Sequence, residues 1–303
     1  MTFTPAYLNL LHTGELQQRA EQATAALAAC TLCPRNCKTN RVAGKTGFCR
    51  IGATAIVADY GTHPSEEICI SGTRGSGAIF FAGCGLRCLY CQNYSISQTA
   101  HGQPVTPQEL AQMMLSLQTR GCHNINLVTP THVVPQILAA LVIAAQNGLR
   151  LPLVYNSSGY ENLQTLQWLD GIIDIYLPDM KYANPQPARY YSKIRNYAEA
   201  NQTAVREMYR QVGNLTLDSS GVAQRGLLIR HLVLPNGLAG TAQIANFVAQ
   251  ELSPETHFNL LAQYVPHYKA DQFPNIARPI TPQEYADAQA ATQSAGLRNV
   301  YVS

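Results

Sequence analysis

Six short apolar runs that alternate with helical patterns constrain the fold of this chain most strongly. The first run, residues 78–83, is continuous, which is typical of a strand that is buried on both faces of a parallel sheet. The runs are residues 78–83, 124–128, 151–155, 172–177, 226–235 and 257–265. Strands that alternate with helices predict a parallel sheet with right-handed crossovers, whether the sheet is open or closes into a barrel. In either arrangement, catalytic residues belong at the carboxyl ends of the strands.

Helix-start signals separate several of these runs. Thr106 and Glu109 form the pattern of a capping box with Pro107 at the first helical position, and apolar residues follow at helical spacing. A second Thr-Pro-Gln-Glu sequence at residues 281–284 predicts the start of a final helix. Residues 1–29 are expected to form a helical lead-in that ends in an alanine-rich stretch.

Composition narrows the class of protein. The chain has 303 residues, which is enough for one large domain. Only 13% of the residues are charged and the net charge is +3, so no strong field would draw the chain to nucleic acid or to a membrane. The sequence shows no secretory signal pattern, and its longest apolar run, residues 137–145, is too short to span a bilayer. A cytoplasmic location with reduced cysteines is the expectation.

The nine cysteines fall into two groups and two single residues. An odd number cannot pair fully into disulfides within one chain, and grouped thiols in a reducing compartment indicate metal ligands or catalytic groups. Cys69 and Cys122 stand apart from both groups. We expect these two to be buried thiols without a chemical role.

The first group lies in the sequence FFAGCGLRCLYCQN, directly after the first predicted strand. Cys84, Cys88 and Cys91 have the spacing C-x3-C-x2-C. A [4Fe–4S] cluster takes four ligands, so three thiolates would hold it and leave one iron open for another ligand. The alternatives are a zinc loop or reduced buried cysteines, although zinc sites favour paired C-x2-C knuckles.

This motif and its flanks resemble the radical S-adenosylmethionine (SAM) superfamily, in particular its pyruvate formate-lyase-activating-enzyme-like branch. The resemblance rests on SGTRGSGAIFFAGCGLRCLYCQNYSIS, NINLVTPTH, VYNSSGY, DIYLPDMKY and RHLVLP, and extends from about Cys30 to His267. It implies an α/β fold, a partial (β/α)6 barrel. It also implies that the open iron binds SAM and that one electron cleaves the sulfonium to a 5′-deoxyadenosyl radical, which abstracts a hydrogen atom.

The resemblance also implies roles for individual residues. Tyr90 would lie against the adenine, and Thr129 begins the stretch that replaces the family's glycine-rich contact with the SAM amine. Asn156 follows the third strand where activating enzymes place an Asn-Gly turn, and His231 and His267 would reach the ribose. Asp179 and Lys181 match an Asp-x-Lys pair that engages the amine and the carboxylate of SAM. An acid and a base two apart on a strand share one face, which suits a zwitterion, although an ordinary salt-bridged strand end would look the same.

The second cysteine group precedes the predicted barrel. Cys30, Cys33, Cys37 and Cys49 have the spacing C-x2-C-x3-C-x11-C, and four thiols suffice for zinc or for a second [4Fe–4S] cluster. Several basic residues and no acidic residue lie between Cys33 and Gly52. We interpret them as compensation for thiolate charge rather than as a nucleic-acid site, because no ladder of aromatic residues is interleaved with them.

These observations predict five segments. They are a lead-in (1–29), a Cys-rich metal-binding segment (30–52), a connector (53–77), a radical SAM partial barrel (78–268) and a C-terminal extension with a helix (269–303). The leading hypothesis is an enzyme that abstracts a hydrogen atom from a glycine of a protein, with a reducing electron donor of the flavodoxin or ferredoxin type. The alternatives are radical modification of a small molecule or peptide, and a non-enzymatic iron–sulfur or zinc module.

Overall fold

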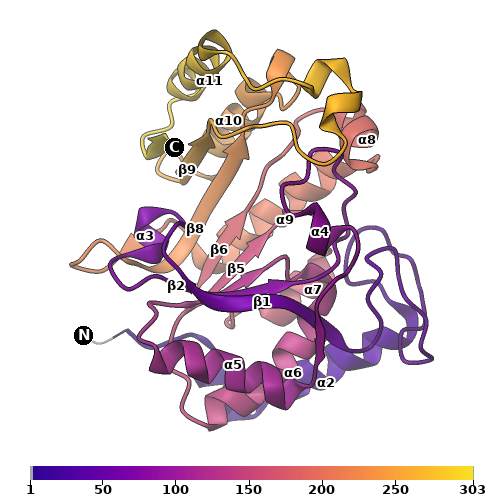
Figure 1. Ribbon diagram of the computed structural model, residues 1–303. Helices are drawn as coiled ribbons and strands as arrows, with labels where there is room; N and C mark the ends of the chain where they lie inside the picture. The colour runs from indigo at the N-terminus through magenta and orange to yellow at the C-terminus, as the bar shows by residue number, and fades with distance from the viewer. Residues whose placement is uncertain (1–2, 303) are drawn as a thin grey trace.

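The computed structural model describes residues 3–302 and contains one open sheet that carries helices along its outer side (Figure 1). The strands of the sheet are β1 (Ala55–His63), β2 (Ser76–Phe81), β3 (Gln103–Val105), β4 (Ile125–Val128), β5 (Leu153–Ser157), β6 (Ile175–Pro178), β7 (Thr216–Leu217), β8 (Ala223–Leu232), β9 (His257–Leu261) and β10 (Val300–Val302).

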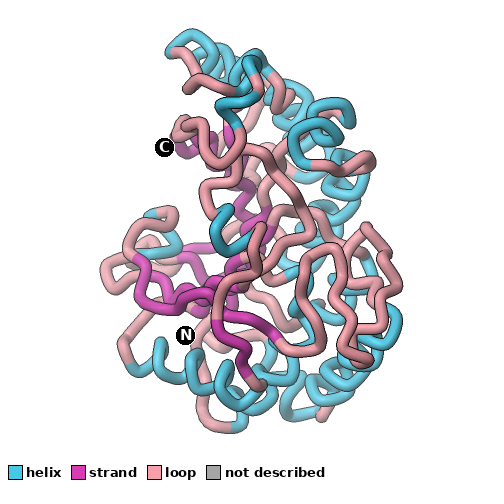
Figure 2. Tube along the Cα trace, turned by 45° about the vertical axis from the view of Figure 1, so that its right-hand side comes forward, coloured by secondary structure: helices cyan, strands magenta, loops and turns pink. Residues whose placement is uncertain are grey.

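The strand order is β10-β9-β8-β6-β5-β4-β2-β1-β3, with β7 paired to β8 outside this path. Neighbouring strands from β2 to β10 in this order run parallel, whereas β1 is antiparallel to both β2 and β3. In Figure 2 the helices lie below, to the right of and above the strand layer, so the sheet curves without closing. This architecture confirms the predicted α/β fold and partial barrel.

The helices alternate with the parallel strands as the sequence predicts. The α-helices are α1 (Tyr7–Thr13), α2 (Glu15–Ala25), α3 (Ile68–Ser71), α4 (Tyr94–Ser97), α5 (Pro107–Thr119), α6 (Val134–Gln146), α7 (Leu163–Leu169), α8 (Pro185–Ser192), α9 (Tyr197–Val212), α10 (Thr241–Phe247) and α11 (Pro282–Ser294). Shorter 3-10 turns and one π turn are η1 (Ala26–Ala29), η2 (Thr131–Val133), η3 (Pro235–Gly237), η4 (Val248–Leu252), η5 (Ala270–Gln272) and η6 (Pro274–Ile276).

Both predicted capping boxes are present. The Thr106 hydroxyl accepts a hydrogen bond from the Glu109 backbone N–H at 3.2 Å, and the Glu109 carboxylate accepts one from the Thr106 backbone N–H at 2.7 Å. Thr281 and Glu284 repeat these two contacts at the start of α11. Each box satisfies two backbone donors that the first turn of a helix would otherwise leave unpaired.

The connector predicted at residues 53–77 differs from the structure. Residues 55–63 form β1, which pairs along nearly its whole length with β2 and extends the parallel sheet by an antiparallel edge. Its burial is irregular because it lies near the edge of the sheet, so it lacks the continuous apolar run of the central strands. The chain remains extended through Gly61 to His63, where the strand ends.

Two apolar clusters hold the site in place. The larger one fills the space between the sheet and its helices and includes Ile79 of β2, Leu127 of β4 and Leu138 of α6, all fully buried. A second cluster packs around Leu86 and Cys88 and is rich in tyrosines from the stretch that follows β6. The loop that carries the first cysteine group is therefore anchored by aromatic packing at the carboxyl ends of the strands.

Candidate functional site

A cavity of about 530 Å³ opens at the carboxyl ends of the parallel strands. Its lining includes side chains from the loop after β2, from the ends of β5, β6 and β8, and from the segment after β9. Among these are Cys88, Tyr90, Cys91, Asn156, Asp179, Lys181, Arg230 and His267. Parallel strands bring these residues together although they are separated by as much as 179 positions along the chain.

The three-cysteine loop turns sharply as it leaves β2. Gly83 has a φ of +79°, and a Cβ atom there would lie 2.5 Å from the carbonyl oxygen of Cys49, so only glycine fits between the loop and the Cys-rich segment. The loop is also fastened to the end of α8, because the backbone N–H groups of Arg87 and Leu89 donate to the carbonyl oxygens of Ser192 and Tyr191 at 3.1 and 2.8 Å.

Hydroxyl groups contact two of the three sulfur atoms. Ser192 Oγ donates to Cys88 Sγ at 3.0 Å, and Ser97 Oγ lies 3.2 Å from Cys91 Sγ. Burial raises the pKa of Cys84 to about 12 and that of Cys88 to about 11, and the thiolates of the loop add to this rise by mutual repulsion. The free thiols of Cys84 and Cys88 therefore stay protonated at neutral pH, whereas binding to iron would deprotonate them.

A [4Fe–4S] cluster fits this loop by its donor chemistry. Three thiols lie on one short segment, two of them line the cavity, and hydroxyl groups are in place to hydrogen-bond two sulfurs. Within residues 3–302, no three His, Cys, Asp or Glu side chains converge closely enough to hold one metal ion. A cube of four irons and four sulfides is wider than one ion, so its thiolates stand farther apart.

An acid–base network forms the opposite wall of the cavity. Lys181 Nζ lies 2.7 Å from Asp179 Oδ2, and Arg230 Nε donates to Asp179 Oδ1 at 3.0 Å. Arg230 Nη2 donates to Asn156 Oδ1 at 2.6 Å. Although burial opposes ionisation, these two cations hold the pKa of Asp179 below its ordinary value. The wall thus presents one carboxylate and two cations on neighbouring strands.

The structure separates the other predicted ligand residues. Tyr90 lines the cavity, where its hydroxyl pairs with Tyr182 at 2.7 Å, and His267 lines it as an exposed residue. His231 does not: its ring is fully buried and pairs with the Met180 carbonyl at 2.6 Å and the Thr241 hydroxyl at 2.9 Å. Thr129 does not line the cavity either.

The reason His231 lies outside the cavity is the period of the strand. Successive side chains of β8 point to opposite faces, so Arg230 enters the cavity and His231 turns toward α10. Sequence reasoning selected the histidine and missed Arg230 and Glu66, which lies 3.7 Å from Arg230. A charged residue within the apolar run GLLIRHLVLP was the signal that could have identified Arg230.

The four cysteines of the Cys-rich segment lie together but outside the cavity. None of the four lines the cavity. A Cβ atom added at Gly47 would lie 3.3 Å from Cys37 Sγ and 3.6 Å from Cys49 Sγ, so these two sulfurs are close to the same glycine. Burial raises the pKa of Cys33 to about 12, and the neighbouring Cys49 and Cys30 thiolates add to this.

A buried arginine supports this second group. Arg41 is fully buried, its Nη1 lies 3.7 Å from Cys30 Sγ, and it donates to the carbonyl oxygens of Gly52 and His132, each at 2.8 Å. One cation therefore faces the thiols directly, as expected if basic residues offset thiolate charge. The two single cysteines, Cys69 and Cys122, are buried and unpaired, as predicted.

No helix within residues 3–302 combines the length and the apolar character that crossing a bilayer would require. A family model described as a 4Fe-4S single cluster domain matches residues 70–184, which include the three-cysteine loop.

Two curated relatives match nearly the whole chain. Uncharacterized protein MJ0674 of Methanocaldococcus jannaschii is 28% identical over 296 residues, which cover 94% of this chain and 80% of the relative. Uncharacterized protein MJ0808 of the same organism is 26% identical over 295 residues, covering 90% of this chain and 80% of the relative.

Among solved structures, the chain is similar to HydG, a maturase of the [FeFe]-hydrogenase, with a TM-score of 0.50 and 14% identity. The match covers 78% of this chain and 53% of HydG, so the chain spans about half the length of that protein. At this level of identity the likeness concerns the fold, which agrees with the partial barrel described above. The cysteine motif, the matching 4Fe-4S single cluster domain and the partial barrel agree with the resemblance to the radical S-adenosylmethionine superfamily found in the sequence.

Proposed function

We propose that this protein is an enzyme that reductively cleaves SAM and uses the resulting radical to abstract a hydrogen atom from a glycine of a protein substrate. The observation that carries the proposal is the single cavity in which two thiols of the C-x3-C-x2-C loop face the network of Asp179, Lys181 and Arg230. A [4Fe–4S] cluster, when bound, supplies the electron that breaks the sulfonium bond of SAM.

Different residues would bind the cluster and the charged groups of SAM. Cys84, Cys88 and Cys91 would hold the cluster. Lys181 offers a cation to the carboxylate of SAM, and Asp179 offers an anion to its amine. Arg230 keeps Asp179 ionised and fixes its orientation through the bond between Arg230 Nε and Asp179 Oδ1.

Aromatic and polar residues would bind the nucleoside part of SAM. Tyr90 is held by Tyr182 and packs edge-on against Tyr264, with ring centroids 5.8 Å apart, so its ring offers a fixed apolar surface to an adenine. Asn156 and His267 add polar groups to the same cavity. His231 takes no part in this proposal because its two ring nitrogens already have partners.

The Cys-rich segment would hold a second metal centre, either another [4Fe–4S] cluster or zinc, and zinc would require its thiols to move closer together than they lie in the structure. Its support is the close approach of Cys30, Cys33, Cys37 and Cys49 and the buried cation of Arg41. The choice of a protein glycine as substrate is supported by the flanking motifs that resemble activating enzymes. The proposed reaction would require a reducing cytoplasm and a one-electron donor of the flavodoxin or ferredoxin type.

The test has two parts. Anaerobic protein with an intact cluster is incubated with SAM and dithionite, and formation of 5′-deoxyadenosine is measured by chromatography. We expect product in the wild type and none in the Lys181→Ala/Asp179→Ala double variant, and absence of product in the wild type would contradict the enzyme. Addition of candidate glycyl-radical enzymes should then produce a glycyl radical signal in electron paramagnetic resonance. Product formation without any such signal would instead favour a peptide or small-molecule substrate.

A further inference from the structure

We propose that an exposed cationic surface around Phe48 is the docking site for an acidic electron-carrier protein. We call it the Phe48 surface, and it comprises Arg35, Phe48, Arg50, Arg87, Lys193 and Arg195. The inference rests on the proposed function, because reductive cleavage of SAM requires a donor of single electrons. One electron would leave the reduced carrier and enter the cluster, and no atom would be transferred.

The first argument is charge. A groove of about 360 Å³ is lined by Arg35, Phe48, Lys193 and Arg195, and no acidic side chain lines it. Over residues 3–302, none of the five cations of the Phe48 surface has a carboxylate within 4.0 Å. In a chain with only 13% charged residues, such a concentration of unpaired cations attracts an acidic partner and speeds its association.

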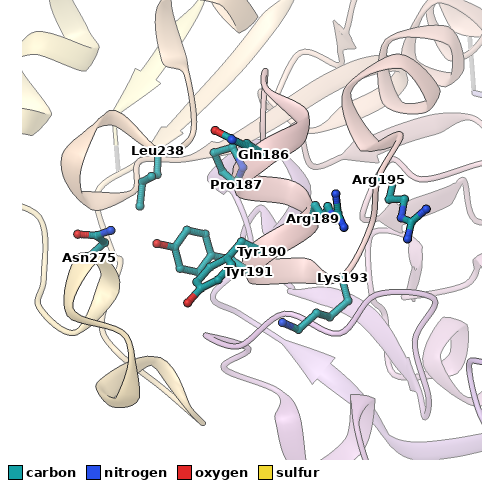
Figure 3. Close-up of a pocket in the computed structure, with 9 residues that line it drawn as sticks. All are labelled: Gln186, Pro187, Arg189, Tyr190, Tyr191, Lys193, Arg195, Leu238 and Asn275. Atoms are coloured by element: carbon teal, nitrogen blue, oxygen red, sulfur yellow. The ribbon is translucent and has the colours of Figure 1, made fainter.

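Several cations elsewhere on the chain pair with carboxylates, unlike those of the Phe48 surface. Arg206 pairs with Glu251 at 2.5 Å, and Arg298 pairs with Glu255 at 2.5 Å. The larger neighbouring groove of about 810 Å³ shares Lys193 and Arg195 and adds Arg189. Figure 3 shows Lys193 and Arg195 at the end of this groove that lies away from Leu238 and Asn275, so the cations of both grooves form one continuous region.

The second argument is that several side chains of this surface are already held in place. The guanidinium groups of Arg35 and Arg87 lie 3.5 and 4.6 Å from the centroid of the Phe48 ring, which is 39% exposed. Arg35 Nη2 also donates to the Lys193 carbonyl at 3.0 Å, and Arg87 donates to the Phe48 carbonyl. Arginine and aromatic side chains that are already fixed lose little conformational entropy on binding, and these residue types are enriched at protein interfaces.

The third argument is proximity to the three-cysteine loop. Arg35 Nε donates to the carbonyl oxygen of Gly85, which lies between Cys84 and Cys88, and Arg87 belongs to the loop itself. Lys193 directly follows Ser192, whose hydroxyl contacts Cys88 Sγ at 3.0 Å. No residue that lines the 360 Å³ groove lines the 530 Å³ cavity. A carrier docked here would lie beside the cluster loop while the cavity stayed open to SAM and substrate.

The experiment measures reduction of the cluster alone, by its absorbance in anaerobic stopped flow. The reductants are a prereduced acidic flavodoxin, a prereduced acidic ferredoxin, and dithionite. The test variant is Lys193→Glu/Arg195→Glu, and the matched control is Arg74→Glu/Arg120→Glu, which reverses two exposed cations away from the loop. Thermal unfolding of all variants verifies that they fold.

We expect at least one carrier protein to reduce the wild type at a rate that falls as salt is added. That rate should drop by about tenfold or more in the test variant and stay unchanged in the control, with dithionite reducing all forms equally. The proposal is overturned if both carriers reduce the cluster of the test variant as fast as they reduce that of the wild type. It is also overturned if the test variant loses salt-sensitive binding of an RNA oligonucleotide but keeps carrier-driven reduction. Failure of the proposed function would show separately. Dithionite would then reduce the cluster without forming 5′-deoxyadenosine, while reduction by the carrier would still depend on the Phe48 surface.

Discussion

The two cysteine groups of this chain differ in what their thiols face. The three-cysteine loop follows β2 and places Cys88 and Cys91 on the wall of a cavity, beside a network of charged side chains. The Cys-rich segment keeps its four thiols out of that cavity and sets one of them against the buried Arg41. Structural metal sites in proteins are usually closed by four protein ligands, whereas catalytic sites keep a position open. On this comparison we propose that the loop carries the chemistry and that the segment gives structural support or relays electrons.

The largest effect is expected from removal of one loop thiol. In Cys88→Ala we expect SAM cleavage with dithionite to fall below detection, because a cluster with two protein ligands is lost or misplaced. Iron content and 5′-deoxyadenosine are the measurements. Cys122→Ala removes a buried thiol that lies 3.3 Å from the Thr62 hydroxyl, away from both cysteine groups, and should keep both. Wild-type turnover in Cys88→Ala would assign the chemistry to another part of the chain.

A thiol of the Cys-rich segment should have a different effect. In Cys33→Ala we expect loss of the second metal and a free energy of unfolding lower by several kcal/mol, since metal binding and folding are coupled. The loop cluster should remain, and SAM cleavage with dithionite should stay within about threefold of the wild type if the segment only supports or relays. Metal analysis and chemical unfolding measure both effects, with Cys69→Ala as the matched buried cysteine. If Cys33→Ala loses all iron, the two groups are not independent.

Arg230 tests whether the cavity wall binds the cofactor. Replacing it in Arg230→Gln removes a charged hydrogen bond to Asp179 and another to Asn156, and we expect SAM affinity to fall by about tenfold or more. Equilibrium dialysis with the oxidised protein measures binding without turnover. Arg206→Gln is the control, because it removes an exposed arginine that pairs with Glu251 far from the cavity. Equal SAM affinity in the wild type and in Arg230→Gln would show that this wall of the cavity does not bind SAM.

The last effect is a pH dependence and concerns a buried carboxyl close to the Cys-rich segment. Burial raises the pKa of Glu161 from its ordinary 4.5 to about 7, although Thr131 and Tyr155 hydrogen-bond the carboxylate. Because the folded state holds this proton more tightly, the stabilisation is complete below about pH 4.5 and is lost as pH rises through 7. We expect Glu161→Gln to reduce this fall in unfolding free energy by up to about 3 kcal/mol. Urea unfolding from pH 5 to 8 measures it, and Asp174, whose pKa is also raised to about 7, retains part of the slope. An unchanged slope would show that Glu161 stays ionised.

The parallel part of the fold was predictable because burial on both faces leaves a direct mark in the sequence. Runs such as residues 78–83 and 124–128 overlap β2 and β4, and Thr106 and Thr281 begin helices through capping boxes. β1 was not predictable in this way, because its burial is irregular and its partner is antiparallel. Such an edge strand depends on tertiary pairing rather than on its own apolar pattern.

The sequence predicted residues of the cavity where they follow the carboxyl ends of the parallel strands. Cys88, Cys91, Tyr90, Asn156, Asp179, Lys181 and His267 all line the cavity. The residues that the sequence misplaced or missed depend on which face of a strand they occupy, as with His231 and Arg230 on β8. Glu66 was not predictable for another reason: it reaches Arg230 from the connection after β1, a contact that only the folded sheet creates.

Mössbauer spectroscopy of iron-57-labelled Cys33→Ala, with and without SAM, tests the central claim most directly. The account predicts that the variant retains about four irons per chain as a [4Fe–4S] cluster, and that SAM shifts the absorption of one iron in four. That result would place a cluster with an open position on Cys84, Cys88 and Cys91. Absence of a [4Fe–4S] signal in the variant, or a cluster spectrum that SAM leaves unchanged, would contradict it.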